Sequence, residues 1–94
     1  TEALWIANFA HERGVGFIPH AWKSGIIKAI TLHLLAVVPD APFLEYAIAR
    51  TPINSALTVQ RFPLHDGFVE VPTAPGLGVD LDPDTTESFH VVRA

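Results

Sequence analysis

Residues 15–48 read VGFIPHAWKSGIIKAITLHLLAVVPDAPFLEYAI and carry the strongest secondary-structure signals in the chain. Residues 15–19 are short, apolar and rich in strand formers, and a long apolar segment then runs over 24–38 until Pro39 stops it. The apolar side chains of that segment spread round more than one face, which is typical of a helix covered on several sides. Residues 43–48 give a second strand signal. The pattern predicts a strand–helix–strand unit with parallel strands and a right-handed crossover.

The flanking segments predict a helix before this unit and a hairpin after it. Residues 1–13 carry apolar side chains at helical spacing, and Gly14 follows where a left-handed cap would lie. Later in the chain, residues 57–62 and 68–71 resemble strands that pair across the Asp-Gly turn at 66–67. Several prolines and glycines then interrupt regular structure, so we expect the last third to be an irregular covering layer.

Size and composition indicate one small domain, or part of one, with an unusually apolar surface. The chain has 94 residues, of which 49% are hydrophobic and 17% charged, whereas about 25% charged residues is usual in soluble domains. So small a body exposes many apolar side chains. Because the chain also contains no methionine, we expect it to be part of a longer protein that begins before Thr1. Within it we distinguish residues 1–50, which hold the strand–helix–strand unit, from a tail over 51–94.

Charge and cysteine content exclude several functional classes. The net charge is -4, and the acidic residues concentrate over 66–94, so there is no basic patch for nucleic acid. The absence of cysteine excludes a disulfide framework, a zinc ribbon and a thiol nucleophile. The longest apolar stretch, 29–39, contains His33 and is shorter than the roughly 20 residues that cross a bilayer. We expect a cytoplasmic protein without a nucleic-acid or membrane partner, because no signal peptide opens the chain.

Metal sites built from this chain alone are not expected. The histidines show no close pair at ligand spacing, which argues against zinc; they are residues 11, 20, 33, 65 and 90. Asp80, Asp82 and Asp84 alternate like the start of a calcium loop. The glycine and the closing glutamate of that loop are missing, so a solvated acidic tail is favoured.

His20 and Glu45 are the candidate functional residues. His20 ends the first predicted strand just before a helix, and the carboxyl ends of parallel strands are where α/β folds place their chemistry. Glu45 lies in the next predicted strand. If the strands are neighbours, one pocket receives an imidazole, which titrates near neutral pH, together with a carboxyl group. The alternative is structural: a hydrogen-bonded loop histidine and an ion-paired glutamate.

The ordered motifs of the chain resemble the C-terminal portion of the mandelate racemase group of the enolase superfamily, the mandelate racemase/muconate lactonizing enzyme family. The resemblance covers essentially the whole chain, and the series of motifs is more specific than any single one. The motifs are GFIPHAWKSGI at 16–26, LHL at 32–34, FLEY at 43–46, DG at 66–67, VP at 71–72 and PGLGV at 75–79.

The resemblance implies an α/β fold: the C-terminal part of a modified (β/α) barrel of the TIM type. The parent would carry an N-terminal α+β capping domain. This chain would hold the sixth helix, the last βα unit, the eighth strand and an irregular tail that packs on the capping domain. The other partners implied are the remainder of the barrel and, for the whole enzyme, further copies in a homo-oligomer.

The resemblance also implies a chemistry for both candidate residues. His20 matches a histidine at the end of the seventh strand that removes the proton α to a substrate carboxylate, paired with an aspartate on the sixth strand. Glu45 matches a glutamate on the eighth strand that donates a hydrogen bond to the resulting enediolate. Mg²⁺ would be held by acidic residues of the third to fifth strands. The aspartate and the metal ligands would all lie outside this chain.

The preferred function is dehydration of a sugar acid or another α-hydroxy carboxylate, because the resemblance links a histidine–aspartate dyad to that branch rather than to muconate lactonization. A racemase or epimerase of the same family is the first alternative, but it needs a second base. The second alternative is a non-enzymatic α/β module whose apolar surface binds another protein. In the preferred reading the 94-residue chain alone is inactive.

Overall fold

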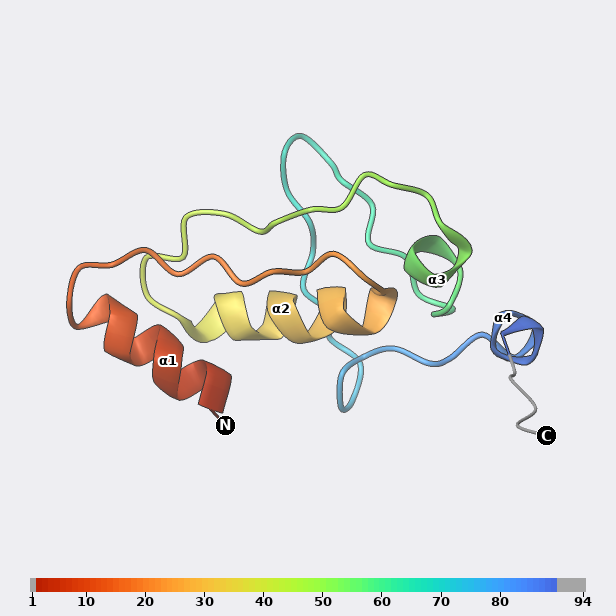
Figure 1. Ribbon diagram of the computed structural model, residues 1–94, viewed down its shortest axis with the longest axis horizontal. Helices are drawn as coiled ribbons and strands as arrows, with labels where there is room; N and C mark the ends of the chain where they lie inside the picture. The colour runs from red at the N-terminus through yellow and green to blue at the C-terminus, as the bar shows by residue number, and fades with distance from the viewer. Residues whose placement is uncertain (1, 90–94) are drawn as a thin grey trace.

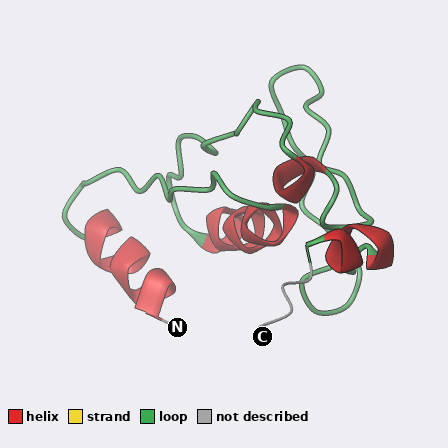
Figure 2. Cartoon of the chain, turned by 45° about the vertical axis from the view of Figure 1, so that its right-hand side comes forward, coloured by secondary structure: helices red, strands yellow, loops and turns green. Residues whose placement is uncertain are grey.

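The computed structural model describes residues 2–89, which form four helices joined by long loops (Figure 1). The helices are α1 (Glu2–His11), α2 (Gly25–Val37), α3 (Pro52–Ser55) and α4 (Pro83–Ser88). Figure 2, coloured by secondary structure, shows the same alternation of helices and loops. No helix among the described residues is long and apolar enough to cross a membrane.

Both long helices lie where the sequence predicts them. At the end of α1, Gly14 adopts a φ of 65°, and its backbone N–H donates to the carbonyl of His11 over 2.9 Å. This is the left-handed conformation that glycine adopts without steric cost. The hydroxyl of Ser24 caps α2 by accepting the backbone N–H of Ile27 at 3.4 Å. Thr1, the first residue of the predicted helix, lies outside the described residues.

The predicted strands 15–19 and 43–48 are extended segments, but no strand forms over residues 2–89. Figure 1 shows the two segments running in the same direction along α2, as the parallel arrangement requires. The prediction of paired strands is therefore wrong for the described residues, although the two segments run in the same direction. In an isolated pair of parallel strands, each strand makes backbone hydrogen bonds along one edge only. Such a pair is therefore only marginally stable without further strands beside it.

The tail differs from the prediction in the same way. The turn at 66–67 is confirmed: Asp66 and Gly67 have φ of 49° and 86°, and His65 and Phe68 exchange backbone hydrogen bonds of 2.9 and 2.8 Å. Positive φ at both central residues is typical of the type I′ hairpin turn. The predicted hairpin strands over 57–62 and 68–71 do not form: His65 bridges Phe68 next to the turn, whereas Thr58 bridges Leu81.

Two short helices in the tail, α3 and α4, were not predicted. Each begins with a proline after a side-chain cap, from Thr51 and Asp82 respectively. Helices this short have few periodic positions, so apolar spacing gives little signal for them. The division of the chain at residue 50 stays a prediction.

The buried core consists mainly of small side chains. Its apolar members over residues 2–89 are Ala7, Ala21, Ala29, Leu32, Val38 and Ala47. Several large side chains lie in solvent instead, including Ile48, which is 82% exposed, and Phe43, which is 71% exposed. Single exposed apolar residues are ordinary, but so many on a chain of 94 residues indicate surface that another body covers. This agrees with the expectation from composition.

Candidate functional site

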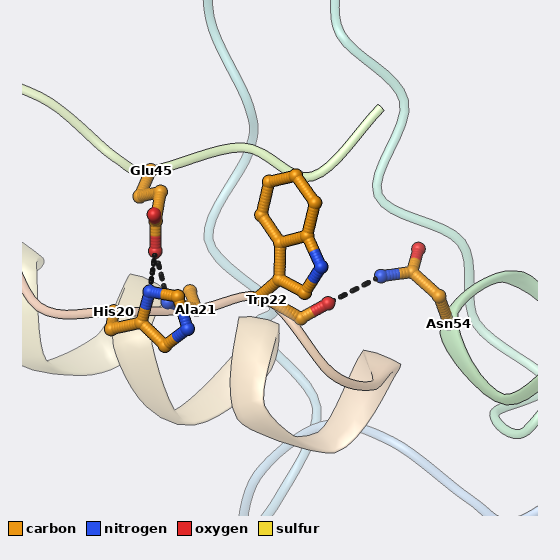
Figure 3. Close-up of polar contacts among 5 residues, drawn as sticks. All are labelled: His20, Ala21, Trp22, Glu45 and Asn54. Carbon is orange, nitrogen blue, oxygen red and sulfur yellow. Dashed lines mark hydrogen bonds and ion pairs between the residues drawn. The ribbon is translucent and has the colours of Figure 1, made fainter. Parts of the chain in front are cut away.

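His20, on the segment that precedes α2, and Glu45, on the segment that follows it, meet side chain to side chain (Figure 3). The Nδ1 atom of His20 lies 2.8 Å from Oε2 of Glu45. The same carboxylate oxygen accepts the backbone N–H of Ala21 at 2.7 Å. The structure thus brings together the two residues that the sequence singles out, although the strands expected to carry them do not form.

The contact determines which imidazole nitrogen is available for chemistry. A carboxylate accepts hydrogen bonds, so a neutral His20 carries its proton on Nδ1 and keeps the lone pair on Nε2. The His20 side chain is 71% exposed, against 35% for that of Glu45. Nε2 is therefore free to reach a molecule outside this chain. Oε1 of Glu45 has no hydrogen-bond partner within the described part of the chain, which leaves this oxygen free for a second interaction.

Backbone and ring contacts hold the segment that carries His20. The His20 ring stacks against Trp22 with 6.5 Å between centroids and 7° between planes. The carbonyl of Trp22 accepts a hydrogen bond of 2.9 Å from Nδ2 of Asn54, a buried residue of α3 (Figure 3). The oxygen of the same amide accepts from Nζ of Lys28 at 3.1 Å. Asn54 therefore joins the His20 segment to the first turn of α2.

Sequence reasoning missed Asn54 and Lys28. A signal existed for Lys28, because a single lysine stands inside a mainly apolar helix. It is only 6% exposed, and burial lowers the pKa of its amine below the usual 10.5. Nothing local in the sequence marks Asn54, since its two contacts reach residues 22 and 28.

The remaining histidines are spread over the molecule. His11 lies 3.5 Å from the carboxylate of Asp40, and Nε2 of His33 lies 3.1 Å from the carbonyl of Leu77. His65 belongs to the turn at 66–67, and His90 lies outside the described residues. Over residues 2–89, no group of three or more His, Asp or Glu side chains is placed to hold a metal ion.

Comparison with known proteins identifies the family of this chain. A model of the family described as enolase C-terminal domain-like matches residues 1–85. The chain belongs to this enolase C-terminal domain-like family. The motif resemblance to the mandelate racemase/muconate lactonizing enzyme family is thereby confirmed.

Relatives within the family carry two kinds of name. The chain is 28% identical to a D-galactarolactone cycloisomerase of Agrobacterium fabrum, a match that covers 97% of this chain and 26% of the relative. It is 38% identical to a D-galactonate dehydratase family member of Oceanicola granulosus, covering 82% and 19%. It is 35% identical to a chloromuconate cycloisomerase of Pseudomonas putida, covering 70% and 18%. The chain spans about a quarter or less of the length of these relatives.

A solved structure supports the enolase C-terminal fold. An enolase from Mycobacterium smegmatis, complexed with formate and acetate, superimposes with a TM-score of 0.68 and 30% sequence identity. The match covers 90% of this chain and 20% of the other. The fold is therefore of the TIM-barrel α/β type that the resemblance implies, even though the described residues form no strands.

Members of the enolase superfamily generally use Mg²⁺. The described residues do not fit a magnesium site, because Mg²⁺ prefers several oxygen ligands in octahedral geometry, and the nearest neighbours of Glu45 are an imidazole and a backbone N–H. Metal ligands would have to come from another part of the protein.

Proposed function

We propose that this chain is the C-terminal barrel segment of a Mg²⁺-dependent enolase-superfamily enzyme that dehydrates a sugar acid. The contact between His20 and Glu45 carries the proposal. It places an imidazole with a free Nε2 beside a carboxyl group with a free Oε1, and the His20 side chain is exposed to solvent. Family membership supplies the reaction class, because relatives of the chain are named dehydratases and cycloisomerases.

In the proposed reaction, Nε2 of His20 removes the proton from the carbon next to the substrate carboxylate. The electron pair of that bond moves into the carboxylate and gives an enediolate. The Nδ1–H of His20 donates to Oε2 of Glu45, which keeps the ring in place during this step. Nε2 then returns its proton to the β-hydroxyl, the C–O bond breaks and water leaves. The resulting enol tautomerises to a 2-keto-3-deoxy acid, so one water is lost for each substrate.

Glu45 has a second proposed role toward the enediolate. Its Oε2 is occupied by the backbone N–H of Ala21 and by His20. A protonated Oε1 would donate a hydrogen bond to the developing negative charge, which is worth most at the transition state. A carbon acid beside an ionised carboxylate is so weak that stabilisation from several directions is required. Metal ions supply such charge stabilisation in many enzymes, and the metal ligands are proposed to lie outside this chain.

The test uses the full-length enzyme that contains this chain, with deuterated solvent and a panel of sugar acids. His20→Asn should abolish both α-proton exchange and keto-acid product, a loss of about 10²-fold to 10⁴-fold or more. Glu45→Gln should slow the reaction while some exchange survives, because an amide still donates a hydrogen bond. His65→Asn, at a histidine of the distant turn, is the matched control and should retain activity. Full exchange in the His20→Asn enzyme would overturn the assignment of the base.

Cycloisomerisation is the second candidate, since a relative named D-galactarolactone cycloisomerase aligns with 97% of the chain. The mass of the product separates the two reactions, because dehydration loses one water and isomerisation loses nothing. The 94-residue chain should be inactive by itself toward either substrate class with Mg²⁺ present. Turnover by the isolated chain would show that the site needs no further residues and would contradict the proposal.

A further inference from the structure

A cavity of about 650 Å³ lies between the first turns of α2, the segment 46–50, α3 and the segment 60–64. Its volume falls within the range of roughly 300–1,000 Å³ that is usual for small-molecule sites. Tyr46 lines this cavity while Glu45 does not. Neither His20 nor Ala21 lines it either, so the cavity is separate from the His20–Glu45 pair.

The charged residues that line the cavity are all cationic. Three cationic residues line it, Lys28, Arg50 and Arg61, and no Asp or Glu is among the lining residues. The whole chain, in contrast, has a net charge of -4. None of the three forms an ion pair with a carboxylate of the described residues. A concave wall of one sign concentrates ligands of the opposite sign.

Lys28 is the unusual member of this wall. The residue is only 6% exposed, and lysine is rarely so buried without an acidic partner. Its Nζ donates to Oδ1 of Asn54 at 3.1 Å and lies 4.8 Å from the centre of the Tyr46 ring. No carboxylate of the described residues lies within ion-pair distance. A buried ammonium has three donors, and one neutral amide with an aromatic face compensates its charge only in part.

We propose that this cavity is a binding site for a small oxyanion, a metabolite with a carboxylate or phosphate group, anchored by Lys28 and approached by Arg50. The anion would accept the remaining donors of Lys28 and neutralise its charge, and such charge-assisted hydrogen bonds are stronger than neutral ones. Arg50 is exposed, and its guanidinium adds a planar pair of donors suited to carboxylate and phosphate. Asn54, Ser55 and Gln60 add polar groups to the lining.

The experiment titrates the ¹⁵N-labelled 94-residue chain separately with inorganic phosphate, with malonate and with neutral malonamide, and follows amide shifts by NMR. Saturable shifts should appear at residues of the cavity wall with phosphate or malonate, and not with malonamide. The anion that binds more tightly identifies the class of group that the site prefers. No saturable shift with either anion, or equal binding of malonamide, would overturn the proposal.

Matched variants assign the binding to the cavity. Lys28→Met keeps the length of the side chain without its charge and should weaken anion binding about tenfold or more. Lys23→Met, at an exposed lysine of the loop before the same helix, should leave affinity within about twofold. Arg50→Gln changes an exposed side chain and should also weaken binding, so it decides the question if Lys28→Met does not fold. Unchanged affinity in a folded Lys28→Met or in Arg50→Gln would contradict the assignment.

Discussion

Nδ1 of His20 lies 2.8 Å from Oε2 of Glu45, and the backbone N–H of the next residue, Ala21, donates to the same oxygen at 2.7 Å. One carboxylate oxygen therefore fixes both the ring and the backbone of the segment that precedes α2. The arrangement is similar in principle to the carboxylate that orients the imidazole of a serine hydrolase triad, where the carboxylate selects one tautomer.

The tautomer of His20 should depend on Glu45. In the neutral form His20 should carry its proton on Nδ1, because the carboxylate only accepts. Glu45→Gln replaces the acceptor by an amide that can also donate to Nδ1, so the population with the proton on Nε2 should rise. Long-range ¹H–¹⁵N spectra of the ring nitrogens measure this directly. His33 is the internal control: its Nε2 faces the carbonyl of Leu77, so its tautomer should not change. An unaltered His20 signal in Glu45→Gln would mean that the contact does not form in solution.

Asn54→Ala should destabilise the chain by about 2–3 kcal/mol, because it removes two hydrogen bonds and leaves a buried ammonium and a carbonyl without their partner. Denaturant unfolding followed by circular dichroism gives this change in the free energy of unfolding. Asn8→Ala on the exposed surface of α1 is the matched control and should change stability by less than about 0.5 kcal/mol. Equal effects of the two substitutions would show that the Trp22–Asn54–Lys28 connection contributes nothing.

Gly25→Ala should be destabilising although alanine is the better helix former. A Cβ at residue 25 would overlap the side chain of Thr58, whose Cγ2 and Cβ would be 3.0 and 3.1 Å away. The effect of Gly25→Ala should therefore shrink in a Thr58→Ala background, which a double-mutant cycle measures. Gly16→Ala is the control, since a Cβ there meets nothing within 4 Å. Strict additivity of the two substitutions at 25 and 58 would exclude the overlap as the cause.

Helix α4 should unravel in acid. Asp82 caps this helix, and its pKa is lowered from 3.8 mainly because the backbone N–H of Thr85 donates to the carboxylate. A lowered carboxyl pKa adds stability above the unfolded-state value and loses it as the pH falls through the folded-state value. The ¹³Cα shifts of residues 83–88 should therefore stay helical at neutral pH and move toward coil values below about pH 3.8.

Two substitutions of Asp82 separate the capping role of its side chain from the effect of its charge. Asp82→Asn keeps a side-chain acceptor and should retain helical shifts without their acid transition, whereas Asp82→Ala should lose helicity at all pH values. A persistent acid transition in Asp82→Asn would assign the pH dependence to another carboxyl group.

Local sequence determines both long helices and their ends. The apolar periodicity of α1 and α2, the Ser24 cap and the positive φ of Gly14 depend on residues within a few positions of one another. The Asp-Gly turn at 66–67 is determined in the same way, because only a few residue types adopt positive φ at two successive positions. The motif series also identified the family, since each motif is a short stretch of contiguous residues.

Only the tertiary structure decided which distant groups meet. Extended backbone at 15–19 and 43–48 follows from β-branched and aromatic residues, but strand pairing depends on which backbone edges are available as partners, and none forms among residues 2–89. The sequence proposed His20 and Glu45 as a pair, whereas their 2.8 Å contact, through Nδ1 and one shared oxygen, is a property of the folded chain. Lys28 stood out in the sequence as a lysine in an apolar helix, but nothing there indicated the contacts of Asn54 with Trp22 and Lys28. Hydrogen bonds between side chains far apart in sequence depend on positions set by packing, and no local propensity encodes those positions.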